Sequence, residues 1–230
     1  MITIEYVWFV WASAFLIPWA TLYLFLPAYR QAMLWASFFT MPFGLSEPLF
    51  VPEYWSPPSL FNLARSTGFD IESLIFCFGI GGVGAVLYNV ATGGRLAPMP
   101  LAERRHKLHR FHMFAIAAPF LAFPPLYFLP WNPIYPSIVA MIVGALATVA
   151  CRPDLMKKIW LGGVLFVIYY ALFLWGLDWL SPGYVEKVWN MDALSGVRLL
   201  GLPLEEILFA GAFGICWAGI YEHFMWRRTA

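Results

Sequence analysis

The feature that most limits how this chain can fold is a set of long stretches without a charged side chain. Residues 6–28, 73–94 and 159–177 contain no Lys, Arg, Asp or Glu, and residues 111–151 lack them over a length sufficient for two helices. One helix needs about 20 apolar residues to cross the hydrocarbon core of a bilayer. We therefore expect an integral membrane protein, with the lipid bilayer around it, in the cytoplasmic membrane of a prokaryote.

The composition excludes several other classes of protein. The 230 residues are 61% hydrophobic and include only 14 Lys and Arg and 13 Asp and Glu. A formal net charge of +1 does not give the basic field of a nucleic-acid-binding protein, so no nucleic-acid partner is expected. The three cysteines are scattered, and we interpret them as helix-packing residues. His106, His109 and His112 recur every three residues without a matching set of carboxylates, so no metal site is predicted.

Seven membrane-spanning helices are predicted from these stretches, in an all-α polytopic fold. A cluster of prolines at 130–136 divides the longest stretch, because proline interrupts helical hydrogen bonding. Placing the N-terminus outside puts 11 of the 14 Lys and Arg on the inner side, which the positive-inside rule favours. The expected topology is therefore N-out and C-in. The predicted helices are 6–28, 31–46, 73–94, two within 111–151, 159–177 and 203–226.

The chain also repeats itself at an offset of 133 residues. Arg65-x-x-Gly68-x-x-x-Glu72 matches Arg198-x-x-Gly201-x-x-x-Glu205, and the match continues through Phe76 and Phe209 to Tyr88 and Tyr221. We expect a single membrane domain, 1–230, built from a first three-helix repeat (1–94), a basic loop with a linker helix (95–133) and a second three-helix repeat (134–230). Four spans separate equivalent helices, so the copies run parallel in a 3+1+3 order.

Acidic residues at the starts of two predicted helices are the best candidates for chemistry. Glu72, Glu205 and Glu206 stand at the starts of the third and seventh predicted helices, and Phe76 and Phe209 follow Glu72 and Glu205 by four residues. A carboxylic acid in apolar surroundings stays protonated more readily and can act as a general acid. Aromatic faces stabilise a carbocation. Protonation of an alkene followed by ring closure needs these elements and no redox cofactor.

The stretch PLEEILF (203–209) resembles the P-x-E-[ED] motif of the small integral-membrane lycopene cyclases, found as two short subunits in some bacteria. That family also has three-helix copies, each followed by such a motif. The segments 44–61 and 213–228 are similar to bacterial proteins identified only as lycopene-cyclase-domain proteins. The resemblance implies a carotenoid cyclase of the intramolecular lyase or isomerase type. In the first copy Asp70 stands in place of the motif proline and Ser73 in place of the second acid.

The resemblance implies that Glu205 and Glu206 are catalytic, with Glu72 at the matching position of the first copy. A hydrophobic polyene or isoprenoid is the implied substrate, and no cofactor is implied. A second copy of the chain or other carotenoid-pathway enzymes are candidate partners. Arg65 and Arg198 are each expected near the Glu seven residues later, where an ion pair would lower the Glu pKa. The candidate substrate-binding residues are Phe209, Phe76, Asp70, Arg65, Arg198, Trp55 and Trp189.

A non-catalytic carotenoid or isoprenoid-lipid binding or transport protein is the alternative, because rhodopsin-like and small sugar-transporter folds share the 3+1+3 order. Covalent retinal is set aside, since all four lysines are expected in loops.

GIGGVG (79–84) matches a dinucleotide-binding pattern, but it lies inside a hydrophobic helix rather than at a strand-to-helix turn. We expect its glycines to allow close helix packing.

Overall fold

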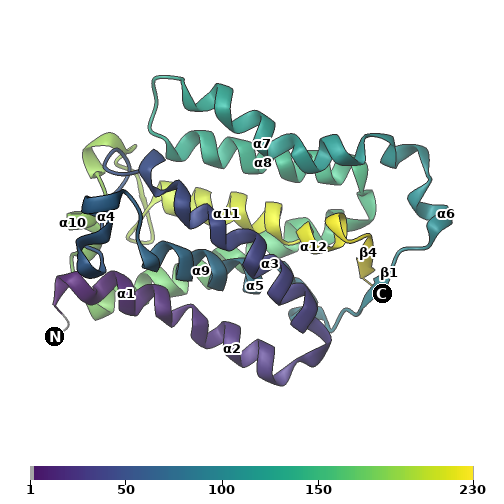
Figure 1. Ribbon diagram of the computed structural model, residues 1–230, viewed down its shortest axis with the longest axis horizontal. Coiled ribbons are helices and arrows are strands. Elements are labelled where there is room, and N and C mark those ends of the chain that lie inside the picture. Colours follow the sequence, from purple (N-terminus) through teal and green to yellow (C-terminus); the bar gives the residue numbers. More distant parts are fainter. Residues whose placement is uncertain (1–2, 230) are drawn as a thin grey trace.

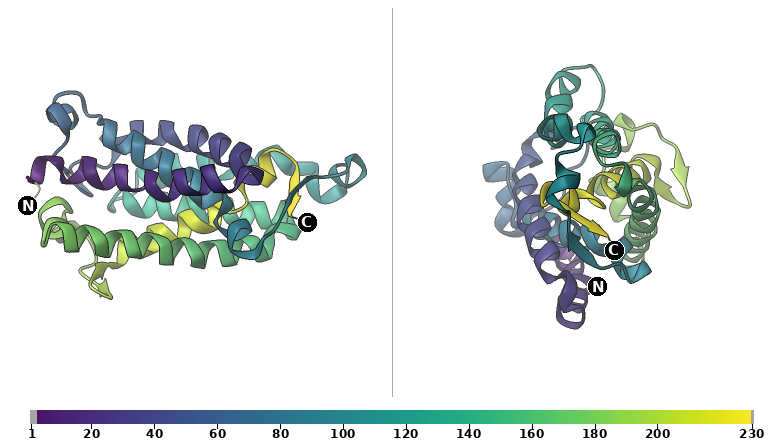
Figure 2. Two further views of the ribbon diagram at one scale, coloured as in Figure 1. Left: turned by 90° about the horizontal axis from the view of Figure 1, so that it is seen from below. Right: turned by 90° about the vertical axis from the view of Figure 1, so that its right-hand side faces the viewer.

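The computed structural model describes residues 3–229 as a mostly helical, elongated bundle (Figures 1 and 2). Met1, Ile2 and Ala230, at the ends of the two predicted repeats, lie outside the described residues. The elements of the first half are α1 (Ile4–Ala14), α2 (Leu16–Phe25), η1 (Pro27–Tyr29), α3 (Arg30–Thr40), η2 (Met41–Leu49), η3 (Leu60–Asn62), α4 (Leu63–Thr67), α5 (Ile71–Thr92), β1 (Leu96–Pro98) and α6 (Leu101–Arg104), where η denotes a 3-10 helix.

The second half begins with a basic loop and a helical hairpin. Its elements are η4 (Lys107–Phe111), α7 (His112–Tyr127), α8 (Ile134–Cys151), η5 (Pro153–Leu155), α9 (Met156–Leu180), α10 (Tyr184–Val188), η6 (Met191–Ala193), β2 (Arg198–Leu199), β3 (Leu202–Pro203), α11 (Leu204–Trp217), α12 (Ile220–Phe224) and β4 (Arg227–Thr229). The short strands pair as β1 with β4 and β2 with β3, both antiparallel. The loop between α7 and α8 confirms the predicted division of 111–151 at its prolines.

Five helical segments among residues 3–229 are long and apolar enough to cross a membrane, which indicates a membrane protein. They are Ile4–Phe25, Ile71–Thr92, Ile134–Cys151, Pro153–Leu180 and Leu204–Phe224. The predicted second helix is not among them, because α3 gives way to a 3-10 helix at Met41, beside Pro42. The predicted fourth helix, α7, has 16 residues and contains three prolines. Seven crossings therefore remain a prediction.

Helix α5 lies at the centre and contacts α1, α2, α3, α9 and α11. Helix α11 also packs on α8. The α7–α8 hairpin covers one side of the bundle (Figure 1). Glycines allow these close approaches. A Cβ at Gly214 of α11 would lie 2.7 Å from the Phe166 Cβ and 2.9 Å from the Gly163 Cα of α9. In α5, a Cβ at Gly81 or Gly82 would collide with side chains of α3 and α2. The GIGGVG stretch therefore serves close helix packing, as expected.

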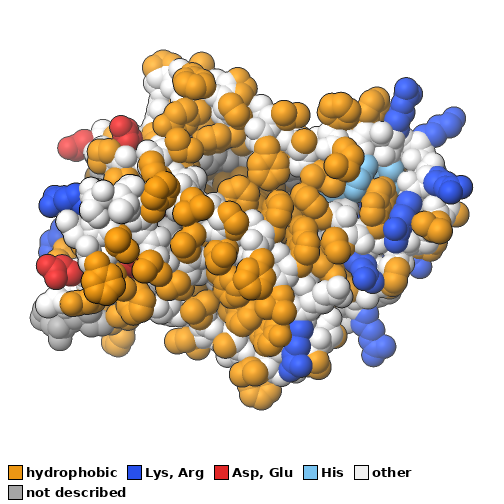
Figure 3. Space-filling view, viewed as in Figure 1, with side chains coloured by type: hydrophobic (Ala, Val, Ile, Leu, Met, Phe, Trp, Pro, Cys, Tyr) orange, Lys and Arg blue, Asp and Glu red, His pale blue; other side chains and the backbone are white. Residues whose placement is uncertain are grey.

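Charges lie mainly at the two ends of the bundle, with a hydrophobic surface between them (Figure 3). Lys and Arg gather at the end formed by α6, β1 and β4, here called the basic end, and the opposite end carries α4 and α10 (Figures 1 and 3). The expectation that all lysines lie in loops is wrong, since Lys157 and Lys158 lie in α9, Lys187 lies in the short helix α10 and Lys107 begins the 3-10 helix η4. Helix α9 begins at Met156, before the predicted span, and Lys158 is buried in an ion pair with Glu222 of α12.

Candidate active site

A cavity lies near the α4–α10 end of the bundle, with about 770 Å³ of empty space including its open mouth. Its wall is largely aromatic and comes from both halves of the chain. Two carboxyl groups, those of Glu47 and Glu206, are the acidic groups among its lining residues. The aromatic lining residues are Trp8, Trp11, Phe15, Phe43, Phe50, Tyr54, Trp55, Phe76, Tyr170, Trp189 and Phe209. The cavity is therefore apolar, rich in π faces and equipped with two acids.

Glu206 lies in the first turn of α11 and is 2% exposed. Its carboxyl accepts hydrogen bonds from the Tyr170 hydroxyl of α9 at 2.7 Å and from the Trp189 Nε1 at 2.7 Å. The Tyr54 hydroxyl makes a further hydrogen bond to it. An indole N–H can only donate, whereas a tyrosine hydroxyl can donate or accept. The two tyrosines therefore allow Glu206 to be held either as a carboxylate or as a protonated acid.

Glu47 comes from η2 in the first half of the chain and is 5% exposed. Its carboxyl accepts a hydrogen bond from the Trp55 Nε1 at 3.1 Å and another from the Ser73 hydroxyl. Ser73 lies 133 residues before Glu206 and therefore occupies the matching position in the first repeat, which has no acid there. Through its hydrogen bond to Ser73, Glu47 supplies a carboxyl group at that position.

Trp55 and Trp189 join these two acids across the middle of the site. Their backbones form an antiparallel bridge, and their ring centroids are 5.4 Å apart. Each indole donates to the acid of its own half, Trp55 to Glu47 and Trp189 to Glu206. The loops that follow the second and sixth predicted helices are therefore in contact. Both tryptophans line the cavity together with Phe76 and Phe209.

Glu72 and Glu205 occupy different surroundings from Glu206. Both are buried, yet neither lines this cavity. Glu72 accepts a hydrogen bond from the backbone N–H of Leu60 at 2.7 Å. Glu205 accepts hydrogen bonds from the backbone N–H of Ser195 at 2.8 Å and from the Tyr135 hydroxyl at 2.7 Å. Each of these matched acids thus ties the start of its helix to the preceding loop.

The remaining predicted residues also lie outside the cavity. Asp70 caps α5 by accepting a hydrogen bond from the Ser73 N–H at 2.5 Å, and burial raises the pKa of its carboxyl. Arg198 pairs with Glu186 at 2.7 Å instead of Glu205, and this bond lowers the pKa of Glu186. The expected ion pair with Glu205 is therefore wrong, because strand β2 directs Arg198 to α10. Arg65 is exposed and lines a separate outer depression.

A second apolar cavity continues from the first toward the α7–α8 hairpin and contains about 1030 Å³ of empty space, open regions included. The two cavities share Phe43, Ser46, Phe50, Phe76, Cys77 and Phe209 in their walls. Figure 3 shows a hollow in the apolar surface between this hairpin and α3. Together they form a long hydrophobic space that begins at the two acids and leads toward the side of the bundle.

Sequence reasoning missed Glu47, Tyr54 and Tyr170 as members of this site. A signal for Glu47 is present in the sequence, since it is the one acid in the otherwise uncharged stretch 31–52. No local pattern distinguishes Tyr170 from the adjacent Tyr169, because only the rotation of α9 decides which ring faces Glu206.

Comparison with protein families gives one match. The model of the family described as lycopene cyclase matches residues 132–224, from just before α8 into α12. No curated protein and no solved structure shows a significant match to the chain. The matched segment includes Glu206, Tyr170 and Trp189. Residues 132–224 of this chain are therefore similar to the lycopene cyclase family, which supports a carotenoid cyclase-like function.

Proposed function

We propose that this protein is a carotenoid end-group cyclase that works without a redox cofactor. The observation that carries the proposal is the aromatic cavity in which Glu206 and Glu47 lie on either side of a tryptophan pair. Burial in apolar surroundings disfavours the ionised form of a carboxyl group. In this proposal one of the two acids therefore retains its proton at neutral pH, as acid catalysis requires.

The reaction follows from this pair. Glu206, at the family motif, donates its proton to the terminal double bond of a linear polyene, which leaves a carbocation on the adjacent carbon. The π electrons of a neighbouring double bond close the ring and move the positive charge into it. Loss of a ring proton to the Glu47 carboxylate restores a double bond. One proton is given and one is taken, so the net reaction is an isomerisation once the proton returns to Glu206.

Aromatic rings around the path of the cation supply its stabilisation. Trp55, Trp189, Phe76 and Phe209 all line the cavity. A cation over such a ring is attracted by its quadrupole by about 2 kcal/mol when water is excluded. The second cavity would hold the apolar remainder of the polyene. In this proposal Glu72 and Glu205 act as positioning residues, because they hold the loops that carry the tryptophans.

The proposal includes the parallel 3+1+3 arrangement, seven crossings and an N-out orientation in a prokaryotic cytoplasmic membrane. Three observations support the repeat. Gly68 and Gly201 both have positive φ, of 81° and 85°, at matching positions. The loops of Trp55 and Trp189 pair with each other. Asn89 and Glu222, also 133 residues apart, are in contact at 3.4 Å between Nδ2 and Oε1.

Expression in a lycopene-accumulating bacterial host, followed by pigment chromatography, tests the function. We expect cyclic end groups from the unchanged protein, and a loss of about 100-fold or more in Glu206→Gln and Glu47→Gln. Glu186→Gln, which changes an exposed acid at the same end of the bundle, is the matched control and should retain the product. Linear pigment only, despite good membrane expression, would contradict the cyclase proposal.

A binding or transport role for a carotenoid or isoprenoid lipid is the second candidate, favoured by the continuous apolar lining of the two cavities. The same experiment separates the two functions. A binding protein would copurify with unchanged linear pigment, and Glu206→Gln would not alter the identity of that pigment.

A further inference from the structure

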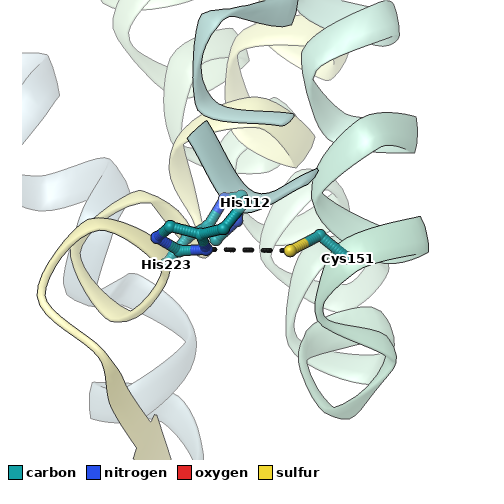
Figure 4. Close-up of side chains that lie close together, drawn as sticks. All are labelled: His112, Cys151 and His223. Carbon is teal, nitrogen blue, oxygen red and sulfur yellow. Dashed lines mark hydrogen bonds between the residues drawn. The ribbon is translucent and has the colours of Figure 1, made fainter. Parts of the chain in front are cut away.

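Three potential metal ligands meet at the basic end of the bundle, and none of them lines either of the two cavities. They are His112 in the first turn of α7, Cys151 at the end of α8 and His223 in α12 (Figure 4). One ligand atom of each lies within 4.8 Å of the others, and all three residues are buried. His223 follows Glu206 by 17 residues, which corresponds to roughly 25 Å along a helix. The cluster is therefore separate from the proposed acid pair.

The spacing around the Cys151 sulfur resembles that of a tetrahedral metal site. The His112 Nδ1 is 3.7 Å from the Sγ, and the Nδ1 of His109 is also 3.7 Å from it. Two ligands at zinc bond lengths of about 2.0 Å for nitrogen and 2.3 Å for sulfur are about 3.5 Å apart at the tetrahedral angle. Two imidazoles at this distance from one sulfur can be joined to it by one donated and one weakly accepted hydrogen bond, or by a shared metal ion.

His223 provides a second and independent observation. It is 2% exposed, and its Nε2 has no hydrogen-bond partner among residues 3–229. Its Nδ1 lies 3.1 Å from the Thr148 hydroxyl, which fixes the ring. A histidine that ligates a metal through one nitrogen is commonly oriented by a hydrogen bond to the other. A buried nitrogen without a partner is costly, and a metal ion would satisfy it.

The charges around the cluster are compatible with a cation. Arg152, the residue after Cys151, is fully buried, but its guanidinium makes two hydrogen bonds to Asp154, at 2.8 and 2.6 Å. It also donates to the backbone carbonyls of Glu222 and Arg227. Its positive charge is therefore offset by a carboxylate.

We propose that His112, Cys151 and His223 bind a zinc-class transition-metal ion, with His109 as the fourth ligand. Nitrogen and thiolate donors in this combination suit Zn²⁺ and exclude the oxygen-preferring Mg²⁺ and Ca²⁺. The ion would join η4, α7, α8 and α12 at one point. The site would be structural, because four protein ligands leave no open position for a substrate.

Metal content of the full-length, tag-free protein in detergent is the first test. We expect about one zinc ion per chain by elemental analysis after gel filtration. Cys151→Ser and His223→Gln should lose the ion, and His109→Gln should lose it more readily to a chelator. Cys216→Ser and His106→Gln are matched controls, because they change a buried cysteine and a neighbouring histidine outside the cluster, and both should retain the ion.

A second measurement on the unchanged chain does not depend on whether these variants fold. Addition of Co²⁺ to the chelator-treated protein should produce a sulfur-to-cobalt charge-transfer absorption. Zn²⁺ should slow alkylation of Cys151 without affecting Cys77 or Cys216, as read by mass spectrometry. A folded protein without zinc, without this absorption and without protection of Cys151 would overturn the proposal. So would full zinc retention by folded Cys151→Ser. Neither result bears on cyclase activity.

Discussion

Glu205 and Glu206 show how strongly one residue of helix rotation changes the surroundings of a side chain. Successive residues of an α-helix point about 100° apart, so two neighbours rarely share one face. Glu206 faces the aromatic cavity with Phe209, three residues later, whereas Glu205 faces the loop at Ser195. The sequence identified both acids as candidates, and the rotation of α11 separates their proposed roles.

This separation gives a prediction for the two adjacent acids. Glu206→Gln should reduce cyclic product by about 100-fold or more, the usual contribution of a general acid. Glu205→Gln should keep part of the activity, because an amide oxygen can still accept the Ser195 N–H bond. Pigment chromatography, normalised to the amount of protein in the membrane, measures both. Equal complete losses in the two variants, with equal protein levels, would contradict the assignment.

Lys158 and Glu222 form a buried ion pair within the bundle, between α9 and α12. Lys158 Nζ also donates to the Ala85 carbonyl at 3.3 Å, and Asn89 contacts the same Glu222 carboxyl. Breaking a buried pair on one side leaves an uncompensated charge, which typically costs 3–5 kcal/mol, about the effect we expect here. The pair therefore makes the junction of α5, α9 and α12 sensitive to single substitutions.

We predict that Lys158→Met lowers the melting temperature of the detergent-solubilised protein more than Lys158→Met combined with Glu222→Gln. The double variant removes both charges of this pair and leaves neither partner as an uncompensated buried ion. Thermal unfolding followed by circular dichroism measures the difference. Lys157→Met, at the adjacent and more exposed lysine, serves as the control and should change little. A double variant that is less stable than the single one would refute this account of the pair.

Helix packing at the element scale depends on individual glycines. Gly214 brings α11 so close to α9 that a Cβ would lie 2.7 Å from the Phe166 Cβ. Gly211, one turn earlier, has only the Val167 Cγ2 within range, at 3.7 Å. Substituting alanine at each of these glycines therefore distinguishes the effect of a less flexible helix from the effect of a collision with α9.

Accordingly, Gly214→Ala should destabilise the protein by about 1–3 kcal/mol, the usual cost of overpacking. Gly211→Ala should be neutral or stabilising, because it adds a helix-favouring residue without a collision. The thermal midpoint in detergent and the yield of monodisperse protein are suitable measurements. Similar behaviour of the two variants would show that α9 and α11 can separate at little cost.

Kinks and irregular turns decide which helices reach spanning length. Pro18 removes the hydrogen bond to the Ala14 carbonyl, and the first helix is interrupted at Phe15 between α1 and α2. Pro136 is tolerated in the first turn of α8, where its missing N–H is not needed. The ends of these helices are therefore explained by the local sequence, whereas the number of membrane crossings is not.

At the scale of the whole molecule, the distribution of charge predicts an orientation. The basic loop with η4 and the C-terminal strand β4 lie together at the basic end, while α4 and α10 lie at the other. Because basic segments stay on the cytoplasmic side, the basic end should face the cytoplasm and the cavity should lie near the outer surface.

Thiol labelling in intact cells tests this orientation. With the parent protein, whose three native cysteines are buried or half-buried, as the blank, Lys187→Cys should react with a membrane-impermeant reagent, and Lys107→Cys should react only after permeabilisation. Both positions are exposed and lie at opposite ends of the bundle. The reverse pattern would place the basic end outside, and labelling of both in intact cells would contradict the expected number of crossings.

The membrane class, the main apolar helices, the repeat and the motif at 203–206 can be predicted from the sequence, because all of these depend on local composition or fixed spacing. Which acids share a cavity depends instead on long-range contacts. Glu47 meets Ser73 across 26 residues and Tyr54 meets Glu206 across 152 residues. The tertiary structure also brings His112, Cys151 and His223 together from three helices. Such contacts depend on helix rotation and on how the two halves pack, which no local pattern records.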